Sequence, residues 1–542
     1  MKSLTRLQIL EKQNKDLRAR LENRQGKSEL ALCAVEDEIK ALKTQASSKD
    51  KVIAMLQSGL CAANEENDGL RQLIDELRSE NNELHDALQK AEDRAAKLEM
   101  MLKKNSSNSD KPPSSDPLFN KAKANSDKEK SCKKVGGQRG HKGHRLIPYP
   151  DPDTVIERRP PCACPGCGGA VTIAEEYEAR QIADIEIIVK VTEERSYYGQ
   201  CADCGKEVQG EFSESFNSPV SYGPNVKAAV AMLNADSNVP IHKTALFISG
   251  LTEGRIDMSD GTVVNIIADL ARRFEPSIKD IVLALASCGV LNVDETGVRS
   301  NGSLAWMQII SNENFSLYGR SPKRGTPNET MSSLIMLFTG VLVHDHLKSY
   351  YRYDHLSHAE CNTHGLRYLK AVTEIMKHPW AKAMAELLTE ANKQKRKLME
   401  AGSSGMTEEE LGAIREKYIG ILDQGRAEYA EAINGKKNIT YYDEERRLLN
   451  RLREYADEHL RFLTDFAVPF SNNGAEHGAR HIKGKQKTSG GFRSDNGVDS
   501  YGVVASVVAS LRKHGMHIFS AMRDAFRGSC PSFVDTVATG TG

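Results

Sequence analysis

The sequence has no apolar run long enough to cross a bilayer. Its longest runs, residues 281–291 and 503–511, fall short of the roughly 20 residues that a spanning helix needs. Residues 1–16 carry charges throughout and lack the apolar stretch of a secretory signal peptide. Net charge is also lacking, because 74 Lys and Arg residues balance 74 Asp and Glu residues. We therefore expect a soluble cytoplasmic protein with no membrane partner, whose basic surfaces are local.

Proline and glycine are scarce in residues 1–104, which are rich in Leu, Glu, Lys and Arg. From residue 67 onward, apolar residues follow a 3-4 spacing over about five heptads, which is typical of a coiled coil. The two seam positions are held by Ile74, Asn81, Leu88, Ala95 and Leu102, and by Leu70, Leu77, Leu84, Ala91 and Leu98. We predict a coiled coil (leucine zipper) that joins two chains as a homodimer. The alternative is a long helix packed on the chain's own body.

Residues 105–130 are too polar to build a core, so they are predicted to form a flexible linker. The next segment, residues 131–159, combines glycines with many cations. This composition favours close approach to nucleic-acid phosphates, although a solvated linker is the alternative. The side chains predicted to contact DNA here are Lys133, Lys134, Arg139, His141, Lys142, His144 and Arg145.

The chain has 11 cysteines, an odd number that argues against a disulfide framework. Four of them form two Cys-x-x-Cys pairs within residues 160–216: Cys164, Cys167, Cys201 and Cys204. Two such knuckles on a small β-sheet, with a strand expected at residues 185–192, supply four thiolates to a structural Zn²⁺. Residues 217–278 follow as a predicted helical module, with helices at 225–233, 241–248 and 262–274 and a helix-turn-helix-like role in reading DNA.

Three acids are the candidates for chemistry. The apolar run 281–293 is predicted to be a buried strand that ends at Asp294, and a second strand, residues 340–344, ends at Asp345. Strand-like stretches at 304–311 and 315–319 and a helix at 333–338 are expected between them. Glu476 follows Ser471 and Asn472, either of which can cap the next helix.

Cations surround the third acid. The predicted DNA contacts there are Arg480, Lys483, Lys485, Lys487 and Arg493. Hard oxygen ligands suit Mg²⁺ or Mn²⁺, and two ions in one site can drive phosphoryl transfer. By spacing alone, a set of solvated surface acids explains the same pattern.

Several motifs together resemble the transposases of the insertion sequence 66 family. They are the Gly-rich residues 136–144, the paired Cys-x-x-Cys, residues 293–296 with Asp294, Asp345 with Tyr350 and Tyr351, Cys361-Asn-Thr-His364, and residues 472–480 with Glu476. The resemblance implies a multidomain α+β protein with an RNase H-like α/β catalytic core at residues 279–365 and 464–526. A helical insertion at 366–463 would interrupt this core, and residues 527–542 would form a tail.

The resemblance implies that Asp294, Asp345 and Glu476 form a DDE triad. For Cys361 and His364 it implies structural packing of the insertion on the core, because two ligands alone do not make a zinc site. The chain departs from the family at Ser471, where Asp is common, and around Arg367, where one cation is missing.

The implied function is a bacterial, nucleoid-associated transposase that binds terminal inverted repeats, cleaves the ends and joins the 3′-OH to target DNA. Small accessory proteins are common partners in the family. Two alternatives stay open from the residues: a non-catalytic zinc-containing DNA-binding regulator, and an RNase H-like nuclease that cuts without joining.

Overall fold

The computed structural model of the chain describes residues 6–60, 67–109, 147–213, 216, 218–435 and 442–533. It divides into two compact units, which are described separately. The first comprises Met1–Asn125, Tyr222–Thr244 and Asp260–Gly542, and the second comprises Ser126–Ser221 and Ala245–Ser259. Within the described residues, no helix combines the length and apolarity needed to cross a membrane.

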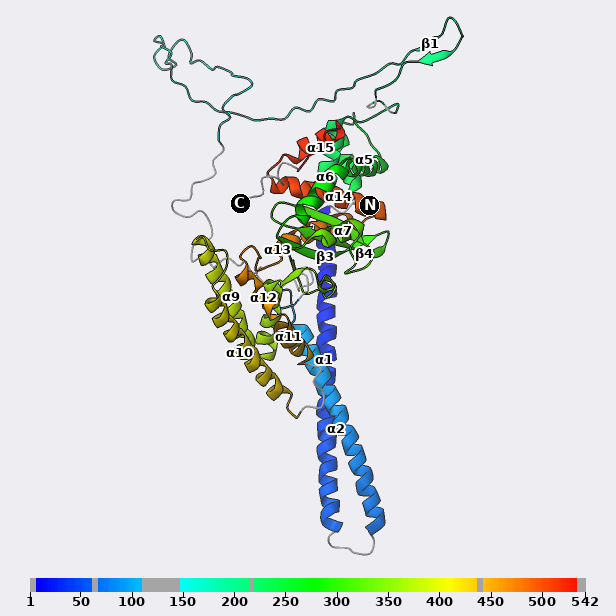
Figure 1. Ribbon diagram of the computed structural model, residues 1–542, viewed down its shortest axis with the longest axis vertical. Coiled ribbons are helices and arrows are strands. Elements are labelled where there is room, and N and C mark those ends of the chain that lie inside the picture. Colours follow the sequence, from blue (N-terminus) through cyan, green and yellow to red (C-terminus); the bar gives the residue numbers. More distant parts are fainter. Residues whose placement is uncertain are drawn as a thin grey trace. The chain divides into compact units, whose positions relative to one another are not determined.

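Two long helices of the first unit are α1 (Arg6–Leu60) and α2 (Asn67–Lys103), and α2 pairs with the later part of α1 (Figure 1). They are antiparallel, because Lys43 pairs with Glu92 while Asp50, later in α1, pairs with the earlier Asn81. Asn81 lies in the seam and donates from Nδ2 to Asp50 Oδ1 over 2.6 Å. The seam of α2 therefore faces α1 of the same chain here, and homodimerisation stays a prediction.

A mixed five-stranded sheet forms the centre of the first unit. Its order is β5-β4-β3-β6-β7. The strands are β3 (Val290–Ser300), β4 (Ser303–Ser311), β5 (Ser316–Ser321), β6 (Val341–His344) and β7 (Ser357–Glu360). β3, β4 and β5 are successively antiparallel, whereas β6 lies parallel to β3, and β7 lies parallel to β6. The predicted strands at 304–311, 315–319 and 340–344 are confirmed.

The prediction of one strand over residues 281–293 is wrong. The first part of this run belongs to helix α6 (Glu275–Ala286), and β3 begins only at Val290. Ile281, Ala284 and Leu285 are buried at helical spacing, so the apolar face of a helix and a buried strand merge into one run in the sequence. As a result, Asp294 lies within β3 rather than at its end.

Two helices of the first unit, α13 (Asn473–Ser489) and α14 (Asp495–Lys513), pack directly on the sheet. Other helices of this unit include α3 (Pro224–Ala231), η2 (Met232–Asp236), α5 (Asp260–Arg273), α7 (Glu329–Leu337) and α15 (Ile518–Phe526). A further helix, α4 (Ile241–Leu251), begins in the first unit and ends in the second. α13 crosses β3 and β4, and α14 packs on β5. The helices predicted at 225–233, 241–248, 262–274 and 333–338 are all present, and a DNA-reading role for the first three stays a prediction.

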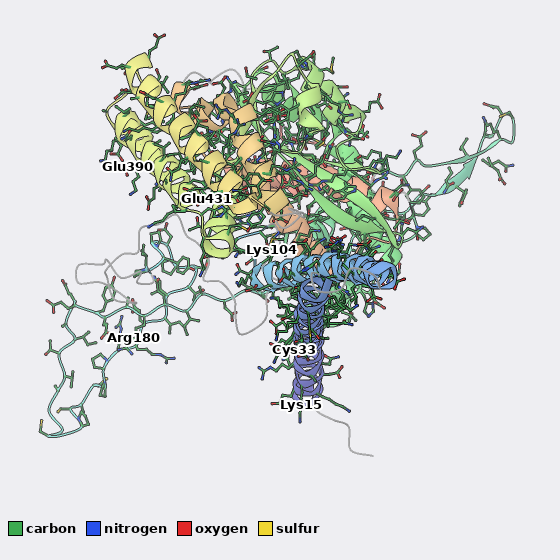
Figure 2. The ribbon with its side chains drawn as sticks, turned by 90° about the horizontal axis from the view of Figure 1, so that it is seen from below. Lys15, Cys33, Lys104, Arg180, Glu390 and Glu431 are labelled. Atoms are coloured by element: carbon green, nitrogen blue, oxygen red, sulfur yellow. The ribbon has the colours of Figure 1, made fainter. Side chains whose placement is uncertain are left out.

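A helical segment follows β7, where the sequence predicts an insertion. The short η3 (Tyr350–Arg352) lies earlier, between β6 and β7, and the segment itself contains α8 (Asn362–Ala371), η4 (Val372–Met376), α9 (Pro379–Glu400), α10 (Glu408–Ile433), α11 (Asp443–Glu454) and α12 (Ala456–Thr464). Trp380, Leu388 and Tyr418 are fully buried in its core, which also includes Val343 of β6. Figure 2 labels Glu390 on α9 and Glu431 on α10, both of which are exposed.

Side chains from helices satisfy backbone groups at both edges of the sheet. On β5, the N–H groups of Ser316 and Tyr318 donate to Ser510 Oγ (3.1 Å) and Ser506 Oγ (2.9 Å) of α14. On β7, the carbonyl of His358 accepts from Arg461 Nε over 2.6 Å. Each edge is thereby occupied by the chain itself.

The second unit contains a small hairpin, β1 (Tyr198–Gln200) and β2 (Glu207–Gln209), which are antiparallel. The strand predicted at residues 185–192 is not observed, and Ile185, Ile188 and Val191 are more than 70% exposed. A segment with no core of its own cannot recover the entropy of forming a strand, which explains the failure of this prediction. Arg180, labelled in Figure 2, lies in the same segment.

Candidate active site

The three candidate acids come from three elements that meet over the centre of the sheet. Asp294 lies in β3, Asp345 directly follows β6, and Glu476 lies in the first turn of α13. The parallel register pairs Val290 with Val341 and continues to Asn292 with Val343. Continued by two more residues, the same offset aligns Asp294 with Asp345. Strand register therefore brings the first two acids side by side.

α13 lies on the face of the sheet to which Asp294 points. Asp294 pairs across the ladder with Ile309, so both side chains project to one face. On that face, a Cβ on Gly478 would come within 2.9 Å of Ile309 and 2.8 Å of the Tyr318 hydroxyl. Only glycine permits this approach, which sets the start of α13, and with it Glu476, over β3.

The electrostatics indicate that the acids share one desolvated space. Burial, followed by the charge of Asp345, raises the pKa of Asp294 from 3.8 to about 7, and Glu476 contributes in the same direction. Glu476 is 9% exposed, and its Oε1 has no hydrogen-bond partner among the described residues. Its Oε2 lies 3.4 Å from Arg480. Crowded carboxylates with a free buried oxygen fit a hard divalent cation such as Mg²⁺ or Mn²⁺.

Asn472 fixes the beginning of α13 to β3. Its Nδ2 donates to the Val293 carbonyl over 2.7 Å, and its Oδ1 accepts from Asn292 Nδ2 over 2.9 Å. The predicted cap is only partly right: Asn472 occupies the N-cap position, but neither its side chain nor that of Ser471 makes a capping bond. Asn472 instead uses its amide to hold the helix against the strand that carries Asp294.

Cys361 and His364 lie beside Glu476 at the start of α8. Cys361 is 1% exposed, and its Sγ accepts from the Asn472 backbone N–H over 3.2 Å. His364 Nδ1 lies 3.3 Å from Cys361 Sγ and 3.7 Å from Glu476 Oε1. The ligand atoms of these three residues lie within 4.8 Å of one another, so the structure adds a third neighbour to the pair seen in the sequence.

A buried polar network supports the segment after Asp345. His346 adopts a left-handed conformation (φ 70°), and its Nδ1 pairs with Glu360 Oε1. Tyr351 donates its hydroxyl to the same oxygen over 2.6 Å. Burial would raise the pKa of Glu360, but the His346 hydrogen bond and nearby histidines lower it to about 2. Sequence reasoning missed Glu360, because only the tertiary structure brings it to His346.

Glu295 points to the opposite face and organises a basic loop. Its carboxylate accepts from Gln308 Nε2 (2.5 Å), the Gly325 N–H (2.9 Å) and the Tyr350 hydroxyl (3.2 Å). In the same loop, the Arg324 guanidinium lies 5.1 Å from the ring centre of Trp306. A cation therefore lies over the Trp306 ring.

The predicted DNA-contacting cations of α13 and of the turn after it differ in exposure. Arg480, Lys487 and Arg493 are exposed. Lys483 is also exposed, but its Nζ donates to the Gly297 carbonyl over 2.6 Å. The prediction for Lys485 is wrong: it is 5% exposed, and its ammonium donates to the Asn234 carbonyl over 2.8 Å. The Lys485 ammonium therefore binds a buried backbone carbonyl and is not exposed for contact with DNA.

The four knuckle cysteines lie in the second unit. Backbone N–H groups of Gly166 and Cys167 lower the pKa of the Cys164 thiol, and Cys201 is affected in the same way by Cys204 and Asp203. Gly205, with φ 70°, closes the second turn through an N–H bond to the Cys201 carbonyl. Each turn thus favours thiolates, as zinc requires.

The two knuckles do not converge, although all four cysteines are among the described residues: no three of their sulfurs lie within 4.8 Å of one another. The predicted contacts at residues 133–145 lie outside the described residues.

Comparison with known families gives two matches. The family model described as the transposase IS66 family matches residues 219–500, which are 282 of the 542 residues and include all three acids. A second model, of a family of unknown function (DUF6444), matches residues 63–146. No curated protein matches the chain. Because the first match covers more than half of its length, this chain belongs to the IS66 family of transposases.

Proposed function

We propose that this chain is a DDE-type DNA transposase that binds the terminal inverted repeats of its element, cleaves the ends and joins the 3′-OH to target DNA. Asp294, Asp345 and Glu476 would hold two Mg²⁺ or Mn²⁺ ions. The observation that carries the proposal is the raised pKa of Asp294, which arises from burial and from the other two acids. Such repulsion is costly unless a cation is bound.

The sheet supports an RNase H-like core. Its three antiparallel strands, followed by two parallel ones, are crossed by α13 on the face of Asp294. This mixed α/β arrangement agrees with the fold that the sequence resemblance implies. The helical insertion lies between β7 and α13, before the third acid, as that resemblance also implies.

The side chains have distinct tasks in the proposed reaction. When bound, the divalent ions supply activation of the attacking oxygen and stabilisation of the leaving oxygen. The three acids bind and orient them, and Asp294 must first lose its proton. Asn472 holds α13 against β3, which keeps Glu476 beside Asp294. Arg480, Lys487 and Arg493 are exposed and offer cationic contacts to the phosphates of the strand to be cut.

End binding would use the second unit. The N–H groups around Cys164 and Cys201 favour thiolates, and the segment between the knuckles exposes its isoleucines. Because the four sulfurs do not converge in this structure, a structural Zn²⁺ shared by them would have to draw the two knuckles together, and its binding would supply the free energy that this small unit lacks. The basic segment at residues 131–159 would add contacts to DNA phosphates.

The test is Asp345→Asn, which removes a ligand charge while keeping the side-chain shape. We expect unchanged binding to terminal repeats and Mg²⁺-dependent cleavage reduced by more than about 100-fold. Asp354→Asn, an exposed acid nine residues further along, is the matched control and should cleave normally. Cleavage by Asp345→Asn at the wild-type rate would overturn the assignment. A strand-transfer assay with a supplied 3′-OH end separates a transposase from a nuclease that only cuts.

A further inference from the structure

Glu476 has one oxygen for which the structure gives no hydrogen bond. Its side chain is 11% exposed, and Oε1 has no hydrogen-bond partner within the described part of the chain. The other oxygen, Oε2, faces Arg480, whose side chain is 63% exposed. A carboxylate held only by a solvent-exposed cation can rotate, whereas a metal ligand must be fixed within about 0.5 Å. Another group must restrain it.

His364 lies beside the free oxygen of Glu476, and its neighbour Arg367 defines its tautomer. Arg367 Nη1 lies 3.3 Å from His364 Nε2. A guanidinium only donates hydrogen bonds, so Nε2 accepts and carries the lone pair. The proton of the neutral ring then lies on Nδ1. In the structure that nitrogen makes its hydrogen bond to Cys361 Sγ over 3.3 Å, and Glu476 Oε1 lies just beyond hydrogen-bond distance, at 3.7 Å.

The backbone beneath His364 is tied to the segment that begins α13. Cys361 Sγ accepts from the Asn472 N–H, and the Asn362 N–H donates to the Phe470 carbonyl over 3.1 Å. The start of α8 and the start of α13 are therefore fixed to each other at two points. His364 and Glu476 therefore lie on two helix starts that are hydrogen-bonded to each other. The position of the His364 ring relative to the Glu476 carboxylate is fixed by these bonds.

We propose that His364 is a positioning residue for Glu476: its Nδ1–H shifts from Cys361 Sγ to the nearby Oε1 when the site is loaded, and this leaves Oε2 to turn from Arg480 to the metal. Arg367 acts one step further out by fixing the tautomer. The inference rests on the proposed function, because it takes Glu476 to be a metal ligand. The proposal gives the two residues of the Cys-x-x-His pair different roles. Cys361 joins α8 to α13, and His364 positions the Glu476 carboxylate.

A metal ion held by Cys361, His364 and Glu476 is the competing explanation for the same cluster. Metal binding through Nδ1 needs a lone pair on that atom, and the Arg367 contact places the proton there instead. It would also withdraw Glu476 from the other two acids. The contacts therefore favour a hydrogen bond.

The experiment compares three substitutions in the full-length protein. The side-chain amide of His364→Asn offers an N–H near the position of Nδ1, that of His364→Gln reaches the position of Nε2, and His364→Leu offers none. We expect His364→Leu and His364→Gln to weaken Mn²⁺ binding, measured by electron paramagnetic resonance without DNA, by about tenfold or more. His364→Asn should restore it to within about threefold of wild type. The Mg²⁺ concentration for half-maximal cleavage should follow the same order, with a smaller change in the rate at saturating Mg²⁺.

Controls separate the outcomes. His355→Leu removes an exposed histidine and should match wild type. If Glu476→Gln loses Mn²⁺ binding and cleavage but His364→Leu binds Mn²⁺ normally, only the positioning role fails. If Glu476→Gln itself cleaves normally, the proposed function fails. Equal losses in His364→Asn and His364→Leu, together with the loss of about one zinc per chain in Cys361→Ser, would overturn positioning in favour of a metal site.

Discussion

Asp294→Asn is expected to stabilise the metal-free protein while abolishing its Mg²⁺-dependent cleavage. Burial and neighbouring acids raise the pKa of Asp294 from 3.8 to about 7. A carboxyl with a higher pKa in the folded state binds more protons when folded, so its contribution weakens the fold as pH rises through this window. At about 1.4 kcal/mol per pH unit, the penalty at about pH 8.5 is about 4 kcal/mol. The neutral amide of asparagine removes it.

The assay is thermal unfolding in buffer free of Mg²⁺ and Mn²⁺. For a cooperative unit of about 400 residues, about 4 kcal/mol corresponds to a rise in Tm of roughly 5 °C. The rise should shrink as pH falls from about 8.5 toward about 4, where Asp294 is protonated in the folded protein. Saturating Mg²⁺ should stabilise the wild type alone. An unchanged or lower Tm at about pH 8.5, or a rise independent of pH, would refute the reasoning. Asp354→Asn serves as the control.

Two further substitutions test how α13 is held and what its lysines do. Asn472→Ala removes two side-chain bonds to β3 and leaves Asn292 Nδ2 without its acceptor, so chemical denaturation should show a loss of about 2–4 kcal/mol, accompanied by slower cleavage. Retained stability would contradict the role of Asn472 as a clamp. Lys485→Met and Lys487→Ala form a contrasting pair: the first should alter the melting temperature but not the salt dependence of DNA binding, and the second should reduce the slope of log K against log salt by about 1. The reverse result would show that the buried and exposed lysines have been assigned the wrong tasks.

The sequence predicted those elements whose boundaries carry local signals. The strand before Asp345 lies between Gly340 and an acid, and its four residues are apolar except for the last. The seam of α2 was readable from periodicity alone. By contrast, the boundary between α6 and β3 lies in a short turn within one apolar run, so a helix and a strand were read as one element.

The sequence predicted the three acids of the candidate site, but it did not predict the contacts that hold them in place. Strand order and register, which align Asp294 with Asp345, depend on long-range pairing. The clamp by Asn472, the Glu360–His346 pair and the burial of Lys485 each join residues from separate elements. Nothing in the local sequence around any of them distinguishes such a role from a solvated polar residue.

The serines of α14 and Arg461 of α12 have a consequence for self-association. Unpaired strand edges recruit further strands, in aggregates as well as in assemblies that extend a sheet from one chain to the next. In this protein the N–H groups of Ser316 and Tyr318 and the carbonyl of His358 already have partners from their own chain. At those positions a second protomer, or a misfolded copy, would contact side chains and would find no unpaired backbone N–H or C=O group. Chains that assemble on DNA ends would then have to contact each other through surfaces other than these strand edges. A high local concentration of the protein at a DNA end would also carry less risk of aggregation by strand addition.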